Sequence, residues 1–512
     1  MMSTFVFKAD DLSLPSLHER LGDRLEIGPR TMLRIGWLDT FDWRLHDEGC
    51  ALTLERESGR RSLVWRTRDR RHPYVLPIDH EVRFVHDLPE GFLRAELEPI
   101  IEQRALLVMG LARVGRRAAR ISGERGNTLV RLAIEETTIA GSDAEPGRPL
   151  RTVTIVPVAI GDRALERVLE QLREVGIGDR ATTDLMAEAA AARGRRPGDY
   201  TTKPRLELRP AQRSDEAMRA VLAQLLETMT ANVGGVIADI DIEFLHDLRV
   251  ASRRARSAIG QIKDVLPRPD ADHLAAELRW LGAVTNDCRD LDVALLELDD
   301  YRRRLGDDAG AVDDLERLLR RKRKAALRRV RAALRSRRFD ELVTSWRALI
   351  TEPAVGDEAA NAARPIAELA GAKIVKAYRR MLKRGKRLAD PPPAAELHRL
   401  RIDAKKLRYL LEFFASLYPE ATVTRLVKEL KSFQDVLGGF NDMEVQRKQL
   451  TGLAEQLMDK GEADASTVFA IGRLADMLRE HQEIYHRDFG DRFAEFSGAA
   501  SRRLYSKTFS GD

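Results

Sequence analysis

Cysteine is almost absent from this chain of 512 residues. The two that occur, Cys50 and Cys288, lie far apart, which excludes a disulfide framework and a cysteine-based zinc site. So few cysteines fit a reducing compartment. The sequence also lacks a basic-then-apolar leader and a long uncharged apolar run, so we expect neither a signal peptide nor a membrane span. These absences predict a cytoplasmic protein with no membrane partner.

Aromatic residues are scarce as well, at 6% of the chain. Proteins that handle single-stranded nucleic acid stack bases on aromatic side chains, so this scarcity counts against them. Charge is abundant, since Lys, Arg, Asp and Glu make up 33% of the residues. The net charge of +6 averages acidic stretches against very basic ones, so local charge density is the more informative quantity. A hydrophobic fraction of 43% indicates a globular chain, with length for two or three domains.

Residues 1–176 have the pattern of an antiparallel α+β domain. Short runs rich in Val, Ile, Leu and Thr, at 62–65, 128–134 and 152–158, are separated by glycine-containing turns. Helical periodicity occurs at about 94–101 and 162–175. Residues 177–210 are rich in Ala, Gly, Pro and Arg and are typical of a linker. From about Ser214 the helical period dominates, which predicts an all-α domain over residues 211–505.

The N-terminal region resembles the CYTH domains, the triphosphate tunnel barrels. The resemblance is carried by LDTFDWRLHDEGCALTLERESGRRSLVWR at 38–66, GERGNTLVRLAIEETTI and TVTIVPVAIGDRALERVLEQLREVG. It implies an antiparallel β-barrel or tunnel of eight strands. It also implies hydrolysis or cyclisation of triphosphates inside the tunnel, with alternating Glu residues for metal and Lys or Arg for phosphate.

This sequence departs from the CYTH pattern where the chemistry should be. The Glu-x-Glu-x-Lys strand is represented by TFVFK at 4–8, and the other two signature strands have become TLE at 53–55 and TIV at 154–156. The positions that remain are Glu135 and the basic residues Lys8, Arg66 and Arg113. A divalent metal needs several oxygen ligands, so we expect a degenerate tunnel with no metal, cofactor or catalytic residue. A CYTH-type triphosphatase or tripolyphosphatase that uses the helical domain as a substrate tether stays open; a phosphate-release assay with magnesium or manganese separates the two.

One charged pattern occurs twice in the all-α region. Residues 246–256 read HDLRVASRRAR and residues 398–408 read HRLRIDAKKLR, about 152 positions apart. The same offset carries LRWLGAVTNDCRDLDV at 278–293 onto LKSFQDVLGGFNDMEV at 430–445. Two matches at one offset indicate an internal duplication, with repeats at about 211–350 and 364–500.

Four basic positions in each copy share one face of a helix that turns roughly 100° per residue. We call each set a cationic ridge: His246, Arg249, Arg253 and Arg256 in the first copy, and His398, Arg401, Lys405 and Arg408 in the second. An apolar stripe runs beside each ridge and suits a bundle core. Like charges one turn apart repel, and neither ridge contains an acid, so an anion from outside is the simplest compensation. The histidines would either bind that anion, gaining protons as pH falls, or serve as core residues.

These motifs are similar to those of the CHAD domain, a histidine-containing α-helical domain often found behind a CYTH domain. The residues that carry the similarity are FLHDLRVASRRAR, WLGAVTNDCRDLDV, ELHRLRIDAKKLRYLLEFF and LKSFQDVLGGFND. The resemblance covers residues 211–505. It implies two four-helix bundles related by a pseudo-twofold axis around a basic groove. It also implies binding of inorganic polyphosphate, for granule association or polyphosphate metabolism.

Two further basic stretches support an anionic ligand. Residues 317–338 hold twelve Lys or Arg and no acid, and residues 373–387 hold eight and no acid. We expect both to face one cavity with the ridges, where low-dielectric walls focus a positive potential. Arginine forks and lysine point charges both suit phosphate oxygens, and a long polyanion gains by releasing its counterions. The additional candidates for contact are Arg323, Lys373, Lys376, Arg380, Lys383 and Lys431.

Two other interpretations are less consistent with the sequence. A nucleic-acid-binding protein is the second alternative, which is disfavoured because the basic stretches and ridges hold only Tyr378 and Tyr409 for stacking. A His-Asp metal centre near Asp290 is disfavoured because the second copy has Arg399 after its histidine. We expect Asp290 and Asp442 to form salt bridges with ridge arginines instead.

Overall fold

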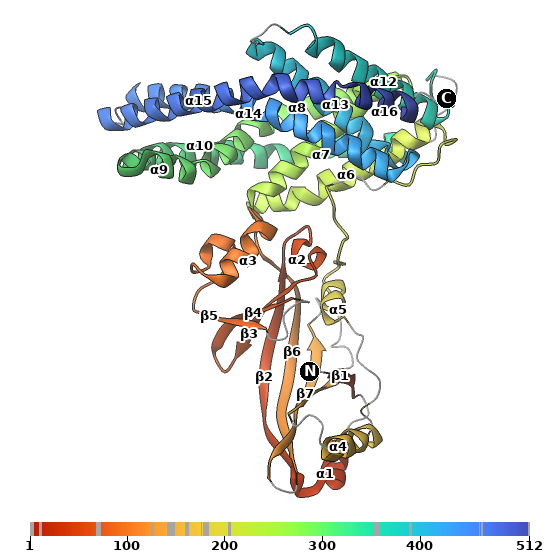
Figure 1. Cartoon of the computed structure of the whole chain (residues 1–512), viewed down its shortest axis with the longest axis vertical. Coiled ribbons are helices and arrows are strands. Elements are labelled where there is room, and N and C mark those ends of the chain that lie inside the picture. Colours follow the sequence, from red (N-terminus) through yellow and green to blue (C-terminus); the bar gives the residue numbers. More distant parts are fainter. Residues whose placement is uncertain are drawn as a thin grey trace. The chain divides into compact units, whose positions relative to one another are not determined.

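The computed structural model divides the chain into two compact units, Met1–Thr201 and Thr202–Asp512 (Figure 1). It describes residues 5–9, 13–67, 73–123, 126–140, 149–158, 163–175, 177, 184–202, 206–351, 359–388, 392–459, 461 and 464–509. The boundary between the units falls within the stretch predicted as a linker.

The first unit is built on one antiparallel sheet, as predicted. Its strands are β1 (Phe5–Lys8), β2 (Leu25–Asp39), β3 (Ala51–Glu57), β4 (Arg60–Arg66), β5 (Tyr74–Ile78), β6 (Leu107–Ser122), β7 (Thr128–Ile139) and β8 (Leu150–Pro157). They pair in the order β1-β8-β7-β6-β2-β3-β4-β5. Within the described residues this order ends at β1 and β5, and no pairing between those two strands closes it.

Short helices cover parts of the sheet. They are α1 (Leu14–Leu21), η1 (Gly22–Arg24), α2 (Arg44–Asp47), η2 (Val85–Asp87), α3 (Phe92–Ile101), α4 (Arg163–Glu174) and α5 (Leu185–Ala191). Helices α3 and α4 occupy the two segments predicted as helical. Helix α5 lies inside the predicted linker, yet it packs against β6 with Ala189 and Ala190 fully buried. A Cβ at Gly110 would stand 2.5 Å from the Ala189 Cβ, so only glycine allows this close approach.

The second unit is helical throughout its described elements. These are α6 (Ser214–Ala238), α7 (Ile242–Gln261), α8 (Arg268–Leu296), α9 (Leu298–Leu305), η3 (Gly306–Ala311), α10 (Val312–Leu334), α11 (Arg337–Thr351), α12 (Ile366–Gly385), α13 (Ala394–Phe413), η4 (Ala415–Leu417), α14 (Glu420–Asp459), α15 (Ala465–Phe496) and α16 (Ala499–Phe509). Helices α6, α7, α8, α10 and α11 pack together, as do α12, α13, α14, α15 and α16. The longest pair, α14 and α15, runs side by side in blue in Figure 1.

The duplication is visible in the helix boundaries. Helices α6, α7 and α8 begin at residues 214, 242 and 268, while α12, α13 and α14 begin at 366, 394 and 420, each 152 residues later. Just ahead of α6 and α12, Arg213 pairs with Pro365 in an isolated antiparallel β-bridge. These two residues also differ by 152. Equivalent positions that contact each other lie on a twofold axis, so the bridge marks the pseudo-twofold axis between the copies.

The apolar stripes beside the ridges form the core, as predicted. Leu248 and Ala255 on α7 and their equivalents Leu400 and Leu407 on α13 are 0% exposed. The side chain of Asp241 caps α7 by accepting from the backbone N–H groups of the first turn, which fixes where the ridge starts.

Helix α6 is long and apolar enough to cross a membrane by length and composition, with a mean hydropathy of 1.3 over its best window. The expectation that no such run exists is therefore wrong. Half of that window is buried inside the unit, against α7 and α11, and Asn232 on the same helix is fully buried and donates to the Thr228 carbonyl. We interpret α6 as a central bundle helix, because its apolar side chains already pack on neighbouring helices.

Candidate polyanion-binding groove

A groove with a volume of about 830 Å³ opens between α7, α12 and α13. We call it the primary groove. Eight of its fifteen lining residues are lysine or arginine, and none is acidic. The cations are Arg253, Arg256, Lys263, Lys373, Lys376, Arg380, Lys405 and Lys406. The other lining residues include Ser257, Gly260, Gln261 and Tyr409. This composition suits an anion that carries several charges.

The groove exists because α7 and α13 contact each other near their C-terminal ends. The Arg253 Nε atom lies 3.4 Å from the Tyr409 hydroxyl, and Gln261 donates to the Lys406 carbonyl at 3.2 Å. Arg254, one position off the ridge, pairs with Glu412 at 2.7 Å. These contacts join the two copies and place Arg253 and Lys405, which are equivalent residues, beside the same hollow.

The groove cations are held in surroundings that disfavour their charge. Burial, with help from Arg401 and Arg253, lowers the pKa of Lys405 to about 8, and Asp442 opposes this only in part. Burial and the neighbouring Arg279 and Arg253 lower the pKa of Arg256 as well. The pKa of Lys373 is lowered by burial and by Lys376. A bound anion would relieve all of these penalties at once.

Six of the predicted contact residues line the primary groove: Arg253, Arg256, Lys373, Lys376, Arg380 and Lys405. Lys263 and Lys406 line it too but were not predicted. Lys263 continues the spacing of the first ridge, seven residues after Arg256, so the sequence carried a signal for it. Lys406 lies beside the ridge, and nothing in the helical period points to it.

The N-terminal halves of both ridges do not line this groove. Arg249 donates to the Gly282 carbonyl and to Thr285 and Asn286 on α8, at 2.6–2.9 Å. Arg401 pairs with Asp442 on α14 at 3.0 Å. Arg249 and Arg401 therefore contact the helices of their own bundles and are not among the residues that line the primary groove.

The histidines and Arg408 also lie outside the lining. His398 Nδ1 lies 2.5 Å from the Asn441 side-chain oxygen, next to α14. His246 belongs to the corresponding half of α7. Arg408 lies 3.4 Å from Glu412 on its own helix. The His398 contact holds the start of the second ridge against α14, whereas the Arg408 contact stays within α13.

The predicted salt bridge between a repeated aspartate and a ridge arginine is present in the second copy, but in the first copy an asparagine lies between the two side chains. Asp442 contacts Arg401 directly. Asp290 instead accepts from Asn286 at 2.7 Å, and Asn286 accepts from Arg249, so the amide joins the two charges. The repeated aspartate therefore has a structural role in each copy.

Helix α10 does not face the groove, which corrects the expectation for residues 317–338. Arg323 is held by Asp292 at 2.5 Å and by Asp239 at 2.7 Å, so it already has its anions. Arg329 pairs with Asp287 at 3.0 Å. Lys431 is exposed on α14 and also lies outside the lining.

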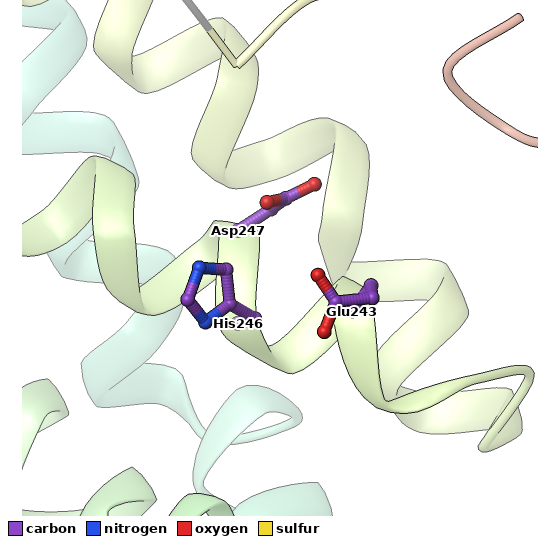
Figure 2. Close-up of side chains that lie close together, drawn as sticks. All are labelled: Glu243, His246 and Asp247. Carbon is purple, nitrogen blue, oxygen red and sulfur yellow. The ribbon is translucent and has the colours of Figure 1, made fainter. Parts of the chain in front are cut away.

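One group on α7 has the side chains to hold a metal ion. Ligand atoms of Glu243, His246 and Asp247 lie within 4.8 Å of one another, and Figure 2 shows all three projecting from neighbouring turns. Glu243 also lies 3.5 Å from Arg289, a cation that a metal would have to displace. The equivalent positions in the second copy are Ala395, His398 and Arg399, so this group is not part of the duplicated design.

Two of the residues left over from the CYTH pattern, Arg66 and Glu135, are paired within the first unit. Arg66 donates to Glu55 at 2.9 Å, and Glu135 accepts from Arg116 at 2.7 Å. Glu136 pairs with Arg30 at 2.8 Å and with Arg151 at 3.2 Å, inside a hollow of about 450 Å³. The Lys8 side chain is outside the described residues, and Arg113 is exposed. These carboxylates are already neutralised by arginine, which leaves little free charge for a metal.

The fold and this groove define a class of protein: a duplicated helical bundle with a cationic groove where the copies meet. The sequence profile of the CHAD domain matches residues 220–451. The CHAD domain structure from the plant Ricinus communis is 30% identical, with 55% of this chain and 95% of that chain covered and a TM-score of 0.46. Residues 220–451 of the chain are therefore identified as a CHAD domain.

Other similarities are weaker. A protein of Mycobacterium tuberculosis, present in strains CDC 1551 and H37Rv, is 26% identical over 350 residues, which cover 67% of this chain and 62% of the relative. PptA from Streptomyces chartreusis covers 55% of this chain and 99% of its own at 18% identity and a TM-score of 0.45. The inorganic triphosphatase NE1496 covers 38% of this chain and 94% of its own at 16% identity and a TM-score of 0.17.

Proposed function

We propose that this protein binds inorganic polyphosphate in the primary groove. The observation that carries the proposal is a lining with eight cations and no acid, in which the pKa of Lys405 is lowered to about 8. Burial and mutual repulsion disfavour the charged forms of these cations. A ligand with closely spaced negative charges therefore stabilises the site. The CHAD family resemblance implies the same ligand.

The groove favours phosphates without bases. Tyr409 is the aromatic residue in the lining, and its side chain is 4% exposed. The guanidinium carbons of Arg254 and Arg408 lie 5.6 and 5.8 Å from its ring centroid. Because the ring is buried among these groups, it offers no open face on which a nucleobase could stack. We propose that the bound form associates with polyphosphate granules in the cytoplasm.

The proposal is tested by filter binding of the full chain to long-chain polyphosphate. We expect retention at low salt and an affinity that falls steeply as salt rises, because binding releases condensed counterions. Single-stranded RNA and duplex DNA serve as competitors at equal phosphate concentration. Competition by either one that matches unlabelled polyphosphate would replace this proposal with a nucleic-acid-binding function.

Affinity for polyphosphate should be steady below about pH 8 and fall above it. The free groove holds Lys405 with a pKa of about 8, and a bound polyanion raises that pKa, so binding above pH 8 requires proton uptake. The charged neighbours of Lys405 are the guanidinium groups of Arg401, Arg408 and Arg253 and the carboxylate of Asp442. The loss should approach tenfold per pH unit for one proton, measured as Kd between pH 6.5 and 9.5 at constant ionic strength.

Lys405→Arg is the matched control for the pH experiment. Arginine keeps the positive charge but stays protonated throughout this range, so its affinity should be flat with pH. If affinity falls equally with pH in the unaltered protein and in the variant, deprotonation of Lys405 is not the cause. A rise in affinity between pH 7.5 and 6 would instead support the histidine role predicted from the sequence.

A further inference from the structure

A second cationic hollow adjoins the primary groove. It has a volume of about 630 Å³ and lies at the C-terminal end of α12. Its lining consists of Arg380, Lys383, Arg384, Arg387, Leu388, Pro393 and Glu396. Arg380 lines both hollows, so they are neighbouring parts of one surface. We call this hollow the side groove.

The carboxylates near the side groove already form ion pairs with arginines. Asp403 lies 2.9 Å from Arg384 and 3.3 Å from Arg380. Glu396 pairs with Arg384 at 3.4 Å and also with Arg399. Lys383 and Arg387 are exposed and form no ion pair within the described part of the chain. These two cations are therefore available to a ligand.

The cations of the two hollows form one row. Lys373, Lys376, Arg380, Lys383 and Arg387 follow one another at helical spacing along α12 and just past its end. At a rise of 1.5 Å per residue this row is about 20 Å long. Its first three members line the primary groove, and its last three line the side groove. A linear polyanion could contact the whole row, whereas a compact anion could not.

The duplicated copy does not repeat this row. The equivalent positions on α6 are Val221, Gln224, Thr228, Ala231 and Gly235, and none of them carries a charge. The ridges are shared between the copies, but the extension is present on α12 alone. The cationic surface therefore extends from the primary groove along α12 and not along α6.

We propose that the ligand is a linear polyphosphate chain that runs along α12, with the side groove as a subsite that only longer chains reach. This inference rests on the proposed function and adds a length requirement to it. Tripolyphosphate binds within the primary groove alone. A long chain contacts Arg380 and continues to Lys383 and Arg387.

The test compares tripolyphosphate with long-chain polyphosphate by isothermal titration of the full chain at fixed salt, with affinities corrected for overlapping sites. In the unaltered protein we expect the long chain to bind at least about tenfold more tightly. The variant K383Q/R387Q should lose most of that gain while its tripolyphosphate affinity changes less than about twofold. The variant K324Q/R328Q removes two exposed cations from α10 and should leave both affinities unchanged.

The outcomes separate the two proposals. If the unaltered protein binds neither anion, the proposed function fails. If it binds tripolyphosphate and long chains equally well, or if K383Q/R387Q weakens both by the same factor, the side groove is no subsite and the inference fails. Lys383 and Arg387 are exposed and form no ion pair with any residue that the structure describes, so we expect an unchanged Tm, which verifies that the variant is folded.

Discussion

The double variant R253E/K405E should bind long-chain polyphosphate at least about a hundredfold more weakly than the unaltered protein. Both residues line the primary groove, and they are the equivalent members of the two ridges. The substitutions remove two attractive charges and place two carboxylates against the ligand, in a cavity where the field is weakly screened. The measurement is filter binding over a range of protein concentrations at two salt concentrations.

The matched control is K324E/R328E on α10, which changes the net charge by the same amount. Both residues are exposed and lie outside the groove lining. If binding depended on overall charge alone, the two variants would lose affinity equally. A loss confined to R253E/K405E locates the site. Equal losses would contradict the groove as the place of binding.

Arg323→Met should lower the free energy of unfolding of the helical unit by about 3 kcal/mol, because it leaves a buried carboxylate without its partner. The Asp292 side chain is 0% exposed, and Arg323 provides its ion pair at 2.5 Å. Burial already raises the pKa of Asp292, and Arg323 offsets this. Methionine preserves much of the arginine volume, so the lost charge pair is the main change. Urea denaturation followed by helical circular dichroism measures the effect.

A second substitution separates lost charge from lost packing. Asp292→Asn in the Arg323→Met background should recover part of the stability, since a neutral amide is easier to bury than an unpaired carboxylate. The folded Arg323→Met variant should still bind polyphosphate, in contrast to the prediction made for Arg323 from the sequence. Loss of binding with intact folding would restore Arg323 as a contact residue.

Much of the fold followed from periodicity. The repeat offset of about 152 residues recurs in the starts of three pairs of helices, and the apolar stripes on α7 and α13 are buried. The repeat offset and the apolar stripes can both be read from the sequence, because the spacing of apolar residues shows which face of a helix is buried. The packing of α5 on β6 was not predictable in this way. It depends on a small contact at Gly110 with residues nearly eighty positions later.

The candidate site was predicted only in part. Spacing identified the ridges, but which half of a ridge faces the groove depends on where α7 and α13 meet, and a helical period does not contain that information. The basic stretch 317–338 was assigned to the groove because its own sequence has no acid. Its partners lie outside α10, since Asp287 and Asp292 are on α8 and Asp239 follows the end of α6. Charge density along the chain therefore overstated how many cations are available.

The bridge between Arg213 and Pro365 has a consequence for how such a site could arise. Two identical half-length chains could meet through the same contact as a homodimer and bring two equal ridges together. In such a homodimer every substitution appears in both subunits. A row of cations on the helix equivalent to α12 would therefore also be present on the helix equivalent to α6. Joining the halves in one polypeptide removes that constraint. The row along α12, with neutral residues at the matching places on α6, is a difference that a fused pair can carry and a homodimer cannot.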